Sequence, residues 1–269
     1  MFRYLTIFIS IFFTIHTHAS PPVLVAGNGK LPQSTVVQVS TVQALLQGIY
    51  DGDTTFEQLK TFGDFGFGTL NGLDGEMVAF DGQFYQVKGD GSAHLVPNTM
   101  KTPYATVHFF HTDKMVILNT PIQSYKDFQH YLTQYLPSHN RPYAFKIRGK
   151  FDYLKTRSVY KQSQPYLPTV EVVAHQSIFE FKNITGTAVG YWFPDYLGQL
   201  TIPGYHLHFL SEDKQRGGHV LNCRVSAATI AIDFIDGVHL LIPQYATFHG
   251  TDLTSYSREE LKKVKGGSD

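Results

Sequence analysis

The sequence predicts a β-rich α+β protein, within the broad α/β class, in which two sheet-based domains carry a few flanking helices. Short apolar stretches recur along the chain and are separated by Asp-Gly, Gly-rich and Pro-containing turns, as in proteins made of many strands. Few stretches have apolar residues at helical spacing. With 269 residues, of which 42% are hydrophobic, the chain is long enough to bury a sizeable core.

The first 36 residues predict an export signal followed by a lead segment. Arg3 precedes an apolar run of about eleven residues, and Thr17-His18-Ala19 offers the small residues that a signal peptidase reads. The apolar run is too short to span a membrane. We therefore expect a signal peptide at 1–19, a flexible lead at 20–36, no membrane span, and an exported protein that is periplasmic or extracellular.

Charge and cysteine content narrow the classes of partner. Lys+Arg and Asp+Glu balance at 22 each, so the basic surplus typical of nucleic-acid binders is absent and no nucleic-acid partner is expected. A neutral or small anionic molecule fits better. Cys223 is the single cysteine, which excludes an internal disulfide, and its apolar surroundings predict a buried, inert thiol.

The expected N-terminal domain, 37–169, combines helices with strands. Three helices are expected to begin at side-chain caps, namely Ser40 or Thr41, Thr54 or Thr55, and Ser124. Asp-Gly pairs at 74–75 and 81–82 predict turns between strands. Further strands are expected at 102–110 and, as a pair of strands, within 141–159.

The expected C-terminal domain, 170–269, is almost wholly strand. Stretches at 179–210, 217–234 and 237–244 are typical of strands joined by turns, after a proline-bounded crossover at 164–176. A short similarity between 104–114 and 205–214, which aligns His108 with His208, favours two related β-rich domains.

Three histidines of this second domain predict a metal site on a hairpin. His206 and His208 would project from one face of a strand, because alternate side chains share a face. The turn-forming stretch "SEDKQRGG" can return His219 to that face. Three imidazoles with open positions form the ligand set of catalytic zinc sites, although imidazole also suits Cu, Fe and Ni.

A cupin-like barrel is an alternative, because it also uses His-x-His. Glu212 follows His208 by four residues, as a cupin would have it, but the third histidine of a cupin is distant in sequence. The presence of His219 within the same predicted hairpin disfavours that alternative.

Several segments together resemble the alpha-acetolactate decarboxylase family, over about residues 37–255. They are "GTLNGLDGEMVAFDGQFYQ", "KTPYATVHFF", "KTRSVYKQSQPYLP" and the long "EFKNITGTAVGYWFPDYLGQLTIPGYHLHFLSEDKQRGGHVLN". The resemblance implies an enzyme, a carboxy-lyase that converts the small molecule 2-acetolactate to acetoin and carbon dioxide. It implies Zn²⁺ as the metal ion, held by His206, His208 and His219. A homodimer is compatible with this expectation.

The resemblance also implies roles for residues outside the hairpin. It places an active-site glutamate at Glu76, an active-site arginine that also binds substrate at Arg157, and a threonine that lines the site at Thr69. The family has a further glutamate near the C-terminus. Counting places Lys265 at that position, and Glu259, Glu260 or no residue could take over its role.

The implied chemistry is the loss of carbon dioxide from a chelated substrate. The zinc ion would act as an electron sink for the enediolate that remains, which stabilises charge as it develops. Arg157 suits a grip on the carboxylate or help in delivering a proton. Glu76 could accept the hydroxyl proton, orient a metal-bound water or ligate zinc.

Two other functions use the same residues. A secreted zinc hydrolase would use the three histidines with Glu76 as general base. An exported metal- or sugar-binding protein would present Tyr191 and Trp192 as exposed aromatics near the site. Neither explains why the segments around Thr69, Glu76, Arg157 and the histidines all match one family.

The alternating Lys146, Arg148 and Lys150 predict a solvated strand face rather than an anion site.

Overall fold

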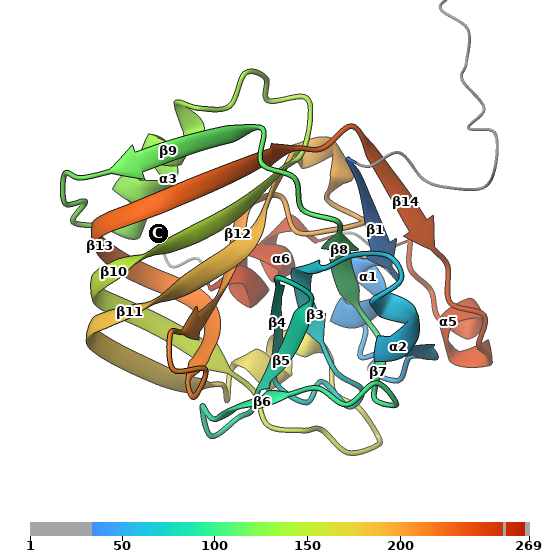
Figure 1. The fold of residues 1–269 in the computed structure, drawn as a ribbon. Coiled ribbons are helices and arrows are strands. Elements are labelled where there is room, and N and C mark those ends of the chain that lie inside the picture. The colour runs from blue at the N-terminus through green and yellow to red at the C-terminus, as the bar shows by residue number, and fades with distance from the viewer. Residues whose placement is uncertain (1–33, 255–256, 267–269) are drawn as a thin grey trace, which may run out of the picture. The chain divides into compact units, whose positions relative to one another are not determined.

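Two large β-sheets make up most of the molecule (Figure 1). The computed structural model describes residues 34–254 and 257–266. The expected signal peptide at 1–19 and most of the lead expected at 20–36 lie outside the described residues, so both stay predictions. The first strand begins at Thr35, within the expected lead. Among the described residues, no helix has the length and apolar character needed to cross a membrane.

The first sheet has seven strands in the order β14-β1-β8-β3-β4-β5-β6. All neighbouring strands are antiparallel except β1 and β14, which run parallel. A separate pair, β2 (Thr54–Thr55) with β7 (Lys101–Thr102), lies outside it. The strands of the sheet are β1 (Thr35–Val39), β3 (Phe65–Thr69), β4 (Glu76–Phe80), β5 (Gln83–Val87), β6 (Ala93–Leu95), β8 (Ala105–His108) and β14 (Gly237–Leu241).

The second sheet is antiparallel and strongly curved, in the order β10-β11-β12-β13-β9, and β10 pairs in addition with β13 (Figure 1). Three of its strands are 16 to 18 residues long. The strands are β9 (Lys114–Leu118), β10 (Tyr143–Ser158), β11 (Ser177–Phe193), β12 (Gly204–Ser211) and β13 (Gly217–Phe234).

The pair of strands expected within 141–159 is wrong, because β10 is one continuous strand. Gly149 lies at the middle of β10, where a pair of strands would need a turn. There the glycine permits close strand approach instead: a Cβ on Gly149 would lie 2.5 Å from the carbonyl oxygen of Ala227. Irregular register between β10 and β13 near Lys150 and Phe151 bends the strand without ending it.

The boundary expected between 169 and 170 does not separate the two sheets. It falls inside a short helix, α4 (Thr169–Val173). β10, on the N-terminal side, pairs with β11 and β13 on the C-terminal side, and β14 joins the first sheet. Pro32–Asp269 form one compact unit, so the second sheet joins segments from both expected domains.

The three expected helices are present and begin at the expected caps. The side chains of Thr41, Thr55 and Ser124 each accept a hydrogen bond from a main-chain N–H of the first helical turn. Two further short helices near the C-terminus were not expected. The helices are α1 (Val42–Leu46), α2 (Phe56–Leu59), α3 (Tyr125–Thr133), α4, the 3₁₀ turn η1 (Asp195–Leu197), α5 (Ala246–Gly250) and α6 (Arg258–Lys265).

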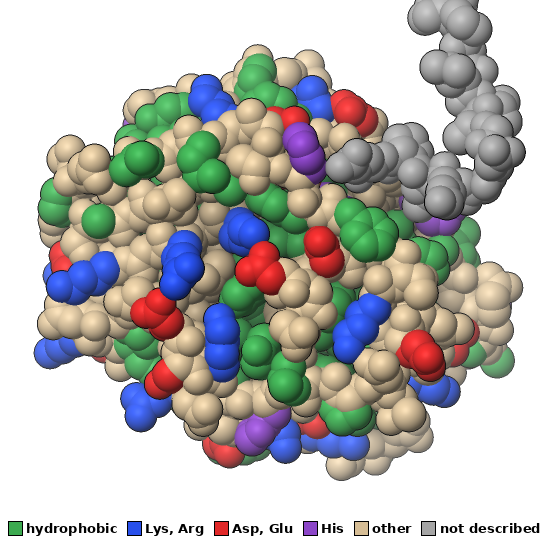
Figure 2. All heavy atoms as spheres, viewed as in Figure 1, with side chains coloured by type: hydrophobic (Ala, Val, Ile, Leu, Met, Phe, Trp, Pro, Cys, Tyr) green, Lys and Arg blue, Asp and Glu red, His purple; other side chains and the backbone are tan. Residues whose placement is uncertain are grey.

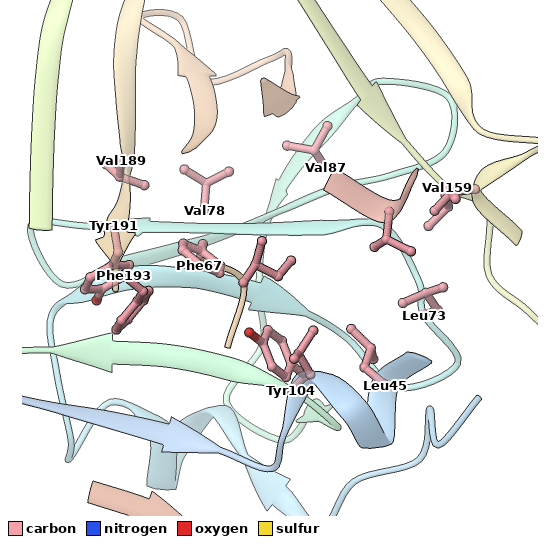
Figure 3. Packing of buried hydrophobic residues seen from close by; sticks show 14 of the residues in the cluster. Leu45, Phe67, Leu73, Val78, Val87, Tyr104, Val159, Val189, Tyr191 and Phe193 are labelled. Carbon is pink, nitrogen blue, oxygen red and sulfur yellow. The ribbon is translucent and has the colours of Figure 1, made fainter. Parts of the chain in front are cut away.

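A continuous apolar cluster joins the two sheets. In Figure 3, Phe67 of β3 lies beside Tyr191 and Phe193 of β11, and Leu45 and Tyr104 belong to the same cluster. Each fully buried side chain of this size contributes about 1.5–3 kcal/mol relative to an exposed one. The cluster therefore fixes how β3 and β4 face β11 and β12. Candidate site residues lie on three of these strands, β3, β4 and β12.

A buried polar network crosses between the sheets at one edge of this cluster. Nδ1 of His108 in β8 lies 2.8 Å from the hydroxyl of Tyr191, and its Nε2 lies 3.1 Å from Oδ2 of Asp233 in β13. Tyr191 is fully buried and Trp192 is half-buried, so Tyr191 is not the exposed aromatic that a sugar-binding surface requires.

Charges on the viewed surface are mixed rather than gathered by sign (Figure 2). Lys146 pairs with Asp81 at 2.9 Å and Arg148 with Glu212 at 2.8 Å. The strand face that carries these cations is therefore locally neutralised, in agreement with its interpretation as a solvated face.

Cys223 is buried in the apolar interior of the second sheet, as expected. Burial raises the pKa of its thiol to about 12. Because the thiolate is the reactive form, the native protein should not react with a disulfide reagent such as DTNB at pH 8. One thiol per chain should react after unfolding in guanidinium. Rapid stoichiometric labelling of the native protein would contradict this packing.

Candidate metal centre and active site

The three histidines converge at the hairpin between β12 and β13. His206 and His208 share one face of β12, and His219 of β13 lies directly opposite His208 in the strand register. Nε2 of His206 lies 3.1 Å from Nε2 of His208 and 2.9 Å from Nδ1 of His219. The predicted convergence is therefore confirmed: one nitrogen from each ring lies within 4.8 Å of the other two.

Main-chain carbonyl groups orient two of the rings. Nδ1 of His208 donates to the carbonyl oxygen of Met77 at 2.7 Å, and Nε2 of His219 donates to that of Lys265 at 3.0 Å. A carbonyl oxygen only accepts, so each of these nitrogens carries the proton. The opposite nitrogen of each ring then directs its lone pair toward the cluster, as in metal sites with outer hydrogen-bond partners.

Burial keeps the imidazoles in their neutral form. Burial, followed by the neighbouring His208, lowers the pKa of His206 well below its ordinary value, and burial likewise lowers the pKa values of His208 and His219. Phe67 packs on two of the rings, with its centroid 4.1 Å from that of His206 and 5.1 Å from that of His208. Three neutral imidazoles whose nitrogens converge, two of them with lone pairs directed inward, fit a transition-metal cation.

Glu76 lies at the start of β4, directly after the predicted Asp-Gly turn. Its Oε2 is 3.5 Å from Nε2 of His208, and its side chain is largely buried. Gly75 has a positive φ of 79°, and a Cβ there would lie 2.2 Å from the carbonyl oxygen of Val87. Glycine is therefore needed for the turn that directs Glu76 toward the histidines.

Arg157 lies near the end of β10, opposite His219 in the strand register, and is almost fully buried. Its Nη1 donates to Oε1 of Gln176 at 3.0 Å and its Nη2 to the carbonyl oxygen of Val264 at 2.5 Å. Its Nε–H has no hydrogen-bond partner in the described part of the chain. Burial lowers the pKa of Arg157, and Glu76 opposes that effect; the guanidinium stays charged.

Thr69, at the end of β3, holds the turn before Glu76. Its hydroxyl donates to the carbonyl oxygen of Gly75 at 2.6 Å. The hydroxyl proton is thus committed to the protein, while the oxygen can still accept a hydrogen bond.

One small cavity brings the sequence-predicted residues together. Its volume is about 50 Å³. Thr69, Glu76, Arg157, His206 and His208 line it, and His219 is not among the lining residues but contacts His206. Its remaining walls are mainly apolar and include Leu45, Phe67, Leu73, Tyr104, Val159, Val173, Ile202 and Val264. A cation at the histidines would face both a carboxylate and a guanidinium across a space with few polar walls.

Neither acidic candidate of the C-terminal segment lines this cavity. The Glu259 side chain is exposed and pairs with Lys263 at 3.1 Å, and Glu260 is not among the lining residues. The ammonium of Lys265 donates to the carbonyl oxygen of Pro203 at 2.7 Å, and burial lowers its pKa to about 8.

Several residues of the site carry no side-chain signal in the sequence. Met77, Val264 and Lys265 contribute carbonyl oxygens, and Phe67 contributes an apolar surface. α6 itself could have been predicted, because Ser257 followed by Glu260 is the spacing of a helix N-terminal cap.

Comparison with known proteins agrees with this geometry. Residues 36–255 match the sequence profile of the alpha-acetolactate decarboxylase family. An alpha-acetolactate decarboxylase of Methanosarcina mazei is 42% identical over 228 residues, which cover 85% of this chain and 79% of the relative. That of Methylococcus capsulatus is 42% identical over 230 residues, which cover 86% and 88% respectively.

A solved structure has the same fold. The crystal structure of alpha-acetolactate decarboxylase from Bacillus subtilis superimposes with a TM-score of 0.84 at 38% identity, and the match covers 87% of this chain and all of that one. The expected β-rich α+β fold and the expected enzyme class, a carboxy-lyase, are confirmed. The chain belongs to the alpha-acetolactate decarboxylase family.

Proposed function

We propose that this protein decarboxylates 2-acetolactate to acetoin at the cavity beside His206, His208 and His219, with Zn²⁺ as its metal ion. The observation that supports this most is the arrangement of three neutral imidazoles, a carboxylate and a guanidinium around one cavity. Zn²⁺ bound by the three imidazoles would supply Lewis-acid stabilisation of the negative charge that develops on substrate oxygens.

Arg157 is the residue suited to hold the substrate carboxylate. Two of its nitrogens are already bound to Gln176 and Val264, which fixes the plane of the guanidinium. The unpartnered Nε–H leaves a donor for a carboxylate oxygen, and the positive charge favours binding of an acid.

Glu76 is the residue suited to move a proton. In the reaction the bond between carbon 2 and the carboxylate breaks, carbon dioxide leaves, and its electron pair stays on the substrate as an enediolate that must be protonated at carbon. Glu76 lies beside His208, on the wall of the cavity next to the histidines. It can take the hydroxyl proton and give a proton to the carbon. Because the carboxylate leaves as neutral carbon dioxide, one further proton must be taken up from solvent to complete the hydroxyl of acetoin. The apolar walls exclude water from the reacting carbon.

A hydrolase would use the same histidines with Glu76 as general base, and the two functions give different products. The expected homodimer does not bear on this choice and stays a prediction.

The direct test is product formation from racemic acetolactate. Purified, zinc-loaded protein should form acetoin enriched in one enantiomer, and a chelator should abolish the activity until zinc is restored. His206→Gln should behave like the chelated protein, because two imidazoles hold zinc less tightly than three. His94→Gln, at an exposed position, serves as the control. No acetoin from zinc-loaded wild type would sink the proposal.

Substitutions at the two charged residues should separate their roles. Glu76→Gln keeps the shape but cannot exchange a proton as a carboxylate does, so kcat should fall by about 10²-fold or more. Arg157→Lys keeps the charge but loses the planar donors, so KM should rise more than kcat falls. Arg148→Lys, on the exposed strand face, should leave both unchanged. Wild-type kinetics in either test variant would remove that residue from the mechanism.

A further inference from the structure

The C-terminal end of α6 touches the site at two points through its main chain. The carbonyl oxygen of Val264 accepts from Nη2 of Arg157, and that of Lys265 accepts from Nε2 of His219. Carbonyl groups in the last turn of a helix have no partner within the helix. Here the main-chain N–H of Gly266 turns back to the carbonyl groups of Lys262 and Lys263, which leaves those of Val264 and Lys265 free for the site.

The polarity of the helix suits these two contacts. The C-terminal end of a helix carries partial negative charge, which stabilises a nearby cation. Arg157 is such a cation, and it is buried where water cannot solvate it. For His219 the carbonyl group selects the ring form whose Nδ1 lone pair faces His206 and His208.

One side chain ties this end of α6 to the segment before β12. Nζ of Lys265 donates to the carbonyl oxygen of Pro203, three residues before His206. The next residue, Gly204, has a positive φ of 71°, and a Cβ there would lie 2.8 Å from the lysine nitrogen. Leu261 and Val264 bury the inner face of α6 in the cluster between the sheets. Figure 1 places α6 beside β12, in the region between the two sheets.

We infer that Lys265 is a positioning residue of the active site: its side chain fastens the end of α6 to Pro203, so that the Val264 and Lys265 carbonyl groups hold Arg157 and His219 in their working orientations. The inference builds on the proposed function. It predicts a role for a lysine that touches neither substrate nor metal.

Loss of the lysine contact should affect the metal and the substrate together. Without it the end of α6 can move, His219 can rotate or change its protonated nitrogen, and Arg157 loses one of its acceptors. Outer hydrogen-bond partners of metal ligands typically contribute 10- to 100-fold in metal affinity. If another contact held the end of α6 in place, removal of the lysine side chain would not lower zinc affinity.

The test compares three full-length variants. Lys265→Met keeps the apolar stem and removes the donor, so we expect zinc affinity to fall about tenfold and KM for acetolactate to rise. Lys265→Arg can still donate to Pro203 and should restore most of both. Lys262→Met removes the same charge from an exposed position of the same helix and should match wild type. Zinc affinity is measured by competition with a chromophoric chelator, without substrate.

Hydrogen exchange of the wild type provides a second measurement that needs no variant. Zinc binding should slow exchange of the α6 amides through the His219–Lys265 contact, while α3, which packs in the separate apolar cluster of the second sheet, should not change. Equal exchange of α6 with and without zinc would count against the coupling.

The outcomes separate this inference from the proposed function. If wild type forms acetoin but Lys265→Met equals Lys262→Met in zinc affinity and KM, the role of Lys265 is overturned and the function stands. If the zinc-loaded wild type forms no acetoin, the proposed decarboxylase function is wrong. In that case zinc affinity of the variants and exchange of α6 still decide whether Lys265 positions His219. If Lys265→Met does not fold, the test rests on Lys265→Arg compared with Lys262→Met, and on hydrogen exchange of α6 in the wild type.

Discussion

The hydrogen bonds that orient the histidine rings are the contacts on which the site depends. One acceptor, the Met77 carbonyl, belongs to the seven-stranded sheet, and the other, the Lys265 carbonyl, belongs to α6. The rings themselves belong to the five-stranded sheet. The lone pairs converge only when both sheets and the C-terminal helix are packed together, so the metal centre is a product of the complete fold rather than of the hairpin.

Burial disfavours the charged form of the imidazoles and of the guanidinium alike, but the consequences differ. It favours neutral imidazoles, which are the form that binds a metal ion. It disfavours the charge of Arg157, which Glu76 on the wall of the same cavity compensates in part. A buried charge without a partner is costly, so the removal of either residue would leave the other poorly compensated. A divalent cation held by the histidines would add positive charge beside Glu76 and would compensate its carboxylate.

Side-chain chemistry could be predicted from the sequence, and main-chain chemistry could not. His-x-His and the turn before His219 predict the hairpin, the helix caps predict three helices, and the resemblance places Thr69, Glu76 and Arg157 at what proves to be one cavity. The carbonyl groups of Met77, Val264 and Lys265 leave no trace in residue type, because every residue has one. The single strand β10 could not be told from a pair of strands, because a glycine that permits close strand approach, such as Gly149, looks the same in one sequence as a glycine that permits a turn. The division into domains failed to match the sheets for a related reason: strand pairing between distant segments is invisible to local patterns.

We propose that three imidazoles of the hairpin hold a metal ion and that the substrate, a 2-hydroxy acid, binds beside it. X-ray absorption at the zinc edge, on protein reconstituted with one equivalent of zinc, tests this most directly. We expect three imidazole nitrogens at ~2.0–2.1 Å from zinc, with only the oxygen ligands changing when an unreactive 2-hydroxy acid is added. A sulfur ligand, fewer than three imidazoles, or a spectrum unaffected by the acid would contradict it.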